Sequence, residues 1–91
     1  MITANDMIKQ SKIETGQRYL DVKTGLMLKV EEVLDASSFI LEGRDRQHEY
    51  RMIVCPNHVS LSSRPIGNTR NFTGGLCGYN RRTGLNLVGV Y

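Results

Sequence analysis

Hydrophobic and polar residues alternate along several short stretches of the chain after Gly16. The clearest stretches are residues 26–30, 39–42 and 50–55. A period of two is typical of a β-strand that buries one face. Between these stretches lie segments that favour tight turns, namely Lys23-Thr24-Gly25, Asp35-Ala36-Ser37-Ser38 and Gly43-Arg44-Asp45-Arg46. We therefore predict a meander of four or five short antiparallel strands over residues 17–62.

The first residues carry a signal for the start of a helix. Asp6 follows Thr3 by three positions, which matches a capping box with Asp in place of the usual Glu. Apolar residues at the following positions favour two or three helical turns. We predict a short helix over residues 3–12 that packs one side on the strands, because isolated helices of this length are marginal.

The last thirty residues have a different composition. Residues 62–91 contain six of the nine glycines, four asparagines and four arginines. This composition predicts a long basic loop over residues 63–84. Apolar residues alternate again near the end of the chain, and we expect a C-terminal strand over residues 85–91.

These elements predict a mainly β fold in a single domain over residues 1–91, since this length suits one hydrophobic core. Five or six short strands leave open edges unless the sheet curls. We expect a small antiparallel β-barrel of the SH3-like or OB-like kind. The segment from Gly16 to Val30 resembles the first hairpin of many small SH3-like domains.

Hydropathy argues against a membrane location. The longest apolar run has four residues, whereas a bilayer span requires about 18 or more. Residues 1–6 lack the basic stretch and apolar block of a secretory signal. We expect a cytoplasmic protein in which Cys55 and Cys77 stay reduced.

Charge is distributed unevenly along the chain. Residues 1–49 hold all nine acids against seven Lys and Arg, whereas residues 50–91 hold five arginines and no acid. The formal net charge is therefore −2 for the first part and +5 for the second. Such asymmetry is typical of a surface that faces a polyanion or an acidic partner.

The arginines of the second part are interleaved with aromatic rings, Gly, Asn, Ser and Thr. Arginine forms bidentate contacts with phosphate, and planar rings stack on bases. We expect a non-enzymatic protein that binds nucleic acid, preferably RNA or a single strand, through one basic face. The candidate residues are Arg51, Arg64, Arg70, Phe72, Tyr79, Arg81 and Arg82.

An alternative partner is another protein. An interaction module or inhibitor, of the kind carried by phages and other mobile elements, would dock the same arginine-rich loop onto an acidic surface of a partner enzyme. The strand at residues 85–91 also offers an edge that can pair with a second copy of the chain to give a homodimer.

Other chemistry finds little support. Cys55 and His58 have a spacing compatible with zinc, and His48 and Cys77 complete the His and Cys of the chain, but a second closely spaced pair is missing. No base is placed beside either cysteine, and residues 74–78 lack the Lys-Ser/Thr ending of a phosphate-binding loop. We expect no metal, no cofactor and no enzymatic activity.

Overall fold

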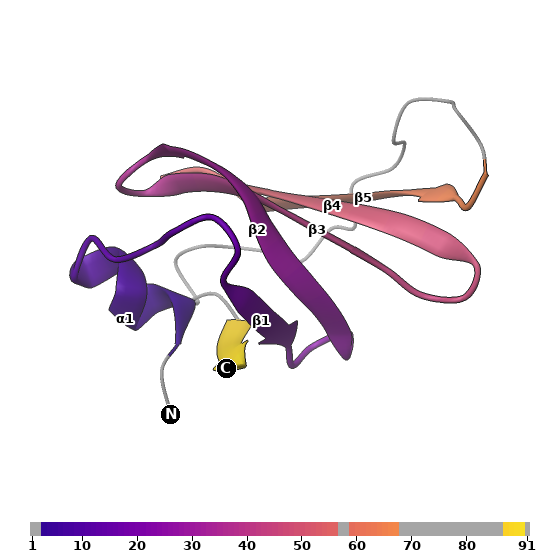
Figure 1. The fold of residues 1–91 in the computed structure, drawn as a ribbon, viewed down its shortest axis with the longest axis horizontal. Coiled ribbons are helices and arrows are strands. Elements are labelled where there is room, and N and C mark those ends of the chain that lie inside the picture. Colours follow the sequence, from indigo (N-terminus) through magenta and orange to yellow (C-terminus); the bar gives the residue numbers. More distant parts are fainter. Residues whose placement is uncertain (1–2, 57–58, 68–86, 91) are drawn as a thin grey trace.

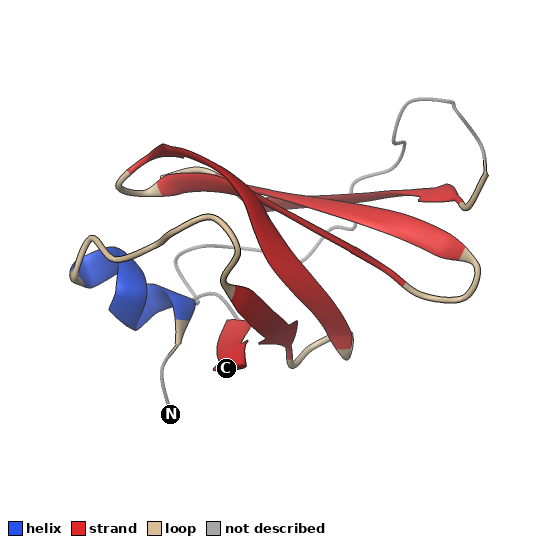
Figure 2. Cartoon of the chain, in the orientation of Figure 1, coloured by secondary structure: helices blue, strands red, loops and turns tan. Residues whose placement is uncertain are grey.

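A computed structural model describes residues 3–56, 59–67 and 87–90 of the chain. Within them the mainly β class is confirmed, since six strands and one short helix make up the fold (Figures 1 and 2). The elements are α1 (Ala4–Lys9), β1 (Arg18–Asp21), β2 (Leu26–Asp35), β3 (Ser38–Arg44), β4 (His48–Val54), β5 (Val59–Pro65) and β6 (Leu87–Val90).

The six strands form one antiparallel sheet in the order β5-β4-β3-β2-β1-β6. The first five make the predicted meander, which extends to Pro65 instead of ending at residue 62. The last strand returns beside the first. Among the described residues β5 and β6 stand at the two edges and are not paired with each other, so the predicted closed barrel is not confirmed.

β2 is the longest strand and lies between two halves of the sheet (Figure 1). One half consists of β3, β4 and β5, and the other consists of β1 and β6. Its pairing with β3 shifts register between Val30 and Glu32 and again between Val33 and Asp35. Such bulges bend a strand and increase its twist. The bend lets the inner side chains of both halves meet in one core.

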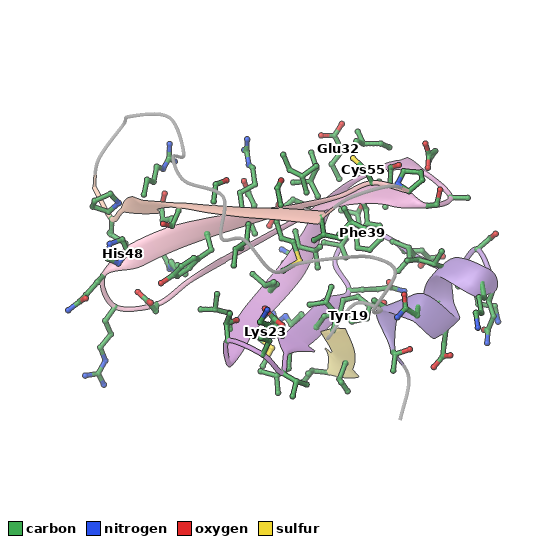
Figure 3. The ribbon with its side chains drawn as sticks, turned by 180° about the vertical axis from the view of Figure 1, so that it is seen from behind. Tyr19, Lys23, Glu32, Phe39, His48 and Cys55 are labelled. Carbon is green, nitrogen blue, oxygen red and sulfur yellow. The ribbon has the colours of Figure 1, made fainter. Side chains whose placement is uncertain are left out.

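The core is built from the inward positions of the alternating pattern. Figure 3 shows Tyr19 and Phe39 between the two halves of the sheet. Each side chain of this size contributes about 1.5–3 kcal/mol when it is fully buried. The fully or almost fully buried apolar residues of the strands are Tyr19, Leu28, Val30, Phe39, Leu41, Met52, Val54, Leu61 and Leu87.

The predicted capping box of α1 is confirmed. The Asp6 backbone N–H donates to the Thr3 hydroxyl oxygen at 3.1 Å, and the Thr3 N–H donates to the Asp6 carboxylate at 3.2 Å. The helix ends at Lys9, earlier than the predicted residue 12, because Ser11 has a positive φ of 55°. No helix in the described part of the chain has the length and apolar character needed to cross a bilayer.

Gly43 lies inside β3, so its prediction as a turn residue was wrong. A Cβ atom at this position would overlap the carbonyl oxygen of Met27 and come within 2.8 Å of the Leu28 side chain. The glycine thus allows β3 to pass close to β2. The turn between β3 and β4 begins at Asp45 instead.

Replacing Gly43 with alanine is expected to destabilise the fold by about 1–3 kcal/mol, because a methyl group must displace backbone atoms of β2. Urea unfolding measures this difference. Arg44→Ala, at the neighbouring exposed position, is the matched control and should stay within about 0.5 kcal/mol of the wild type. Equal unfolding midpoints for Gly43→Ala and the wild type would show that the close approach of the two strands is not required.

Candidate binding face

The outer face of β3 and β4 carries charged side chains in register. Leu41 and Met52 point into the core, so their neighbours Glu42 and Arg51 point outward. Strand pairing sets Glu42 opposite Arg51 and Arg44 opposite Glu49. The meander therefore brings acids of the first part of the chain beside arginines of the second part.

The first row of charges runs from β2 to β4. Arg51 donates from Nε and from a terminal nitrogen to the same Glu42 oxygen, at 3.1 and 2.9 Å. On the other side of β3, strand pairing sets Lys29 of β2 opposite Glu42. Glu42 thus lies between two bases and forms its ion pair with the one on β4.

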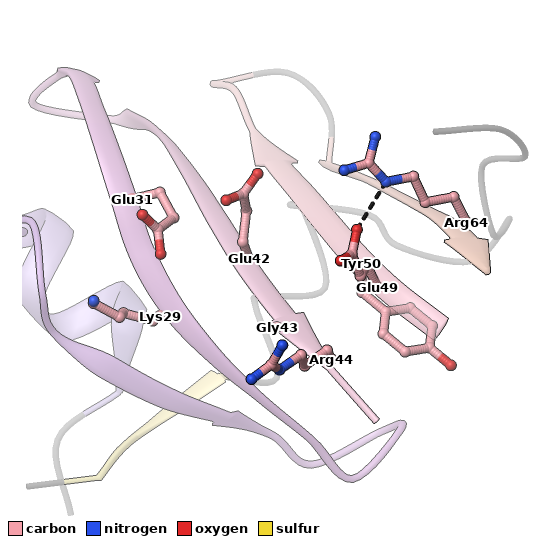
Figure 4. Close-up of a pocket in the computed structure, with 8 residues that line it drawn as sticks. All are labelled: Lys29, Glu31, Glu42, Gly43, Arg44, Glu49, Tyr50 and Arg64. Atoms are coloured by element: carbon pink, nitrogen blue, oxygen red, sulfur yellow. Dashed lines mark hydrogen bonds and ion pairs between the residues drawn. The ribbon is translucent and has the colours of Figure 1, made fainter. Parts of the chain in front are cut away.

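The second row repeats this arrangement one step along the strands. Arg64 on β5 donates from Nε to Glu49 at 2.8 Å (Figure 4). Arg44 is the cross-strand neighbour of Glu49 on the β3 side. Each glutamate therefore takes its arginine from the β4–β5 side of the sheet.

These two ion pairs lie at the surface. The paired side chains are 29–43% exposed, and pairs of this kind contribute about 0–1 kcal/mol to stability. Their larger effect is on the distribution of charge. Arg51 and Arg64 are compensated by glutamates, whereas Lys29 and Arg44 have no ion pair within the described residues.

A shallow pocket of about 340 Å³ opens between the two rows (Figure 4). Its charged lining consists of three bases and three acids, and Tyr50 and Gly43 complete it. The charged residues are Lys29, Arg44, Arg64, Glu31, Glu42 and Glu49. The pocket has no formal net charge, which is suited to a ligand surface that offers both signs.

The turn beside this pocket is held by Asp45. Its carboxylate accepts hydrogen bonds from the Tyr50 hydroxyl at 2.7 Å and from the backbone N–H groups of Gln47 and His48 at 2.7 and 2.8 Å. The Tyr50 bond and then the two N–H bonds lower the pKa of Asp45 to about 2. The same contact raises the pKa of Tyr50. The turn thereby fixes Tyr50 at the end of the pocket.

The structure describes only two of the seven predicted binding residues. Arg51 and Arg64 lie on the outer face, but each is paired with a glutamate. The other five lie outside the described residues, namely Arg70, Phe72, Tyr79, Arg81 and Arg82. Sequence reasoning missed Glu42 and Glu49, because the charge totals of the two parts do not show which strands pair.

Charge over the described residues is balanced. They contain nine acids and nine bases, so the whole formal net charge of +3 comes from Arg70, Arg81 and Arg82. The surface described by the structure is therefore a mixed-charge face. The predicted basic face stays a prediction, because five of its seven residues lie outside the described part of the chain.

The two zinc candidates that the structure describes lie far apart on the sheet. His48 begins β4 and Cys55 directly follows its last residue (Figure 3), and seven residues of extended chain span about 23 Å. His58 and Cys77 lie outside the described residues. The described residues contain no group of three His, Cys, Asp or Glu side chains that can hold a metal ion.

Comparison with protein-family models, with curated proteins and with solved structures finds no match. A fold does not by itself imply a function, so the residues of the site must indicate it. The site offers alternating charges and an open pocket. Alternating charges of this kind can complement a surface that carries the opposite pattern.

The Asp45 turn makes stability depend on pH. The pKa of Asp45 is lower in the folded state than its usual 3.8, so its ionised form stabilises the fold above about pH 4 and this contribution is lost as the pH falls to about 2. Asp45→Asn should show a smaller fall in melting temperature between pH 5 and pH 2 than the wild type. Tyr50→Phe, which removes the largest cause of the shift, should also reduce the fall. Identical acid profiles for all three proteins would contradict this role of Asp45.

Proposed function

We propose that the protein is a small binding module, not an enzyme, which recognises another protein through the outer face of its sheet. The observation that carries this proposal is the pairing of Arg51 with Glu42 and of Arg64 with Glu49. A nucleic acid would bring its phosphates against both glutamates. A protein surface can offer acids to the bases and bases to the acids.

The arrangement of charges supports recognition by complementarity. Each row places a base, an acid and a base on three neighbouring strands, which are about 4.8 Å apart. The rows are Lys29, Glu42 and Arg51, and Arg44, Glu49 and Arg64. A partner surface that reads acid, base, acid at this spacing would match the face in one register. Complementarity of this kind affects specificity and association rate more than affinity.

Nucleic-acid binding is the second candidate, and one observation favours it. All of the excess positive charge belongs to Arg70, Arg81 and Arg82, in the segment that also contains Phe72 and Tyr79. In this candidate that segment supplies the phosphate and stacking contacts without Arg51 and Arg64. The same arginines would also serve to dock on an acidic surface of a partner enzyme.

The proposal includes a curled, barrel-like sheet of the SH3-like or OB-like kind whose edge strands β5 and β6 are not paired with each other. The register shifts in β2 support this curl, because bulges bend a strand and increase its twist. A homodimer through the last strand is less favoured, because Thr3 already pairs with Val88 on the side of β6 away from β1. A second copy would have to displace Thr3 to pair along the whole strand.

Charge reversal tests the protein-binding proposal. The immobilised protein should retain its partner from a nuclease-treated lysate, and Arg44→Glu/Arg64→Glu should lose it, because the second charge row then repels its complement. The control is Lys9→Glu/Lys12→Glu, at exposed positions in α1 and just after it. It makes the same change in net charge and should retain the partner. Retention by the Arg44/Arg64 variant, with its fold confirmed by an unchanged urea midpoint, would refute recognition through this face.

A salt titration with mixed-sequence single-stranded RNA tests the second candidate. The protein-binding proposal predicts no increase in fluorescence anisotropy at low salt. Binding with a log–log slope of about −0.7 per neutralised phosphate would support nucleic-acid recognition instead. In that case Arg81→Ala/Arg82→Ala should weaken binding and reduce the slope.

A further inference from the structure

Three apolar side chains form a row on the outer face of the other half of the sheet. Strand pairing sets Leu20 on β1 opposite Val88 on β6 and opposite Met27 on β2. Their neighbours Tyr19 and Leu28 are fully buried, so this row points away from the core. Met27 is 48% exposed, and Leu20 and Val88 are partly exposed.

Cations border this apolar row. The adjacent row of the same face contains Arg18 opposite Lys29, and both side chains are exposed. Neither has an ion pair within the described residues. The acid closest to Lys29 in the strand pairing is Glu42, and its carboxylate is bound by Arg51.

Acids of this half of the sheet lie elsewhere. Asp21 on β1 is fully buried, and its carboxylate accepts hydrogen bonds from Lys23 N–H and the Thr24 hydroxyl. Glu31 lies on β2 beyond Lys29, on the side away from Met27. Within the described residues of β1, β2 and β6, the apolar row is therefore bordered by Arg18 and Lys29, and neither of these two rows contains an acid.

The other large apolar residue of β2 that is exposed, Leu34, has a different setting. Leu34 is 54% exposed and stands near the far end of the strand, where Glu31, Glu32 and Asp35 lie close along the chain. An acidic ligand would be repelled there. Leu34 therefore provides a control position on the same strand.

We propose that the row of Leu20, Met27 and Val88 receives an acidic amphipathic helix of the partner protein, whose carboxylates pair with Arg18 and Lys29. This inference rests on the proposed protein-binding function and adds the chemistry of the partner. The row spans two strand spacings, about 10 Å. Two turns of a helix rise by about 11 Å, so apolar residues at i, i+3 or i+4, and i+7 match the three side chains.

The probe is a peptide of about 15 residues with Leu on one helical face and Glu on the others, together with the same peptide carrying Lys in place of Glu. Titration of the ¹⁵N-labelled protein with the acidic peptide should shift the amide resonances of Leu20, Met27 and Val88. The basic peptide should bind at least about tenfold more weakly, because Arg18 and Lys29 repel it.

Matched variants locate the contact. Met27→Asp should weaken binding of the acidic peptide by about tenfold, since it removes an apolar contact and adds a like charge. Leu34→Asp makes the same change at an exposed position of the same strand and should alter binding by no more than about twofold. Arg18→Gln/Lys29→Gln should weaken binding and reduce its dependence on salt.

Three outcomes would overturn the inference. The first is that millimolar acidic peptide shifts no resonance, and the second is that the Lys peptide binds equally well. The third is that sedimentation shows a dimer that Met27→Asp dissociates, because a second copy of the chain would then occupy the row. Partner retention from lysate separates this inference from the proposed function. If Arg44→Glu/Arg64→Glu loses the partner while Met27→Asp keeps it, protein binding stands and the apolar row is not the contact.

Discussion

The register between β3 and β4 determines the outer surface of this protein. It places Glu42 opposite Arg51 and Arg44 opposite Glu49. The buried pair of Leu41 and Met52 holds this register, because a slip of one residue would turn the charged side chains into the core. Burial on one face of the sheet thus decides which charges meet on the other.

This constraint divides the five cations on the outer face of the sheet into two groups. Arg51 and Arg64, toward the β5 edge, are compensated by glutamates. Arg18, Lys29 and Arg44, on β1, β2 and β3, have no ion pair within the described part of the chain. The proposals follow this division, since the paired side offers alternating charges and the unpaired side offers cations beside an apolar row.

Local patterns in the sequence predicted the elements well. A period of two, the capping box of Thr3 and the turn glycine at Gly25 each depend on neighbouring residues, and the structure contains all three. The position of Gly43 was missed because its role depends on Met27, which is distant in sequence. Because the turn begins at Asp45, Arg44 remains in β3 and faces Glu49. Charge totals predicted Arg51 and Arg64 as surface residues but gave no information on the glutamates that bind them.

The division of the outer-face cations into paired and unpaired groups is tested most directly by the exchange rate of the arginine Nε–H protons, measured by NMR. The structure bonds the Nε–H of Arg51 to Glu42 and that of Arg64 to Glu49. The account predicts slow exchange with water for these two protons and fast exchange for Arg18 and Arg44. Equal exchange at all four arginines, or slow exchange at Arg44, would show that the charges on the outer face are not divided in this way.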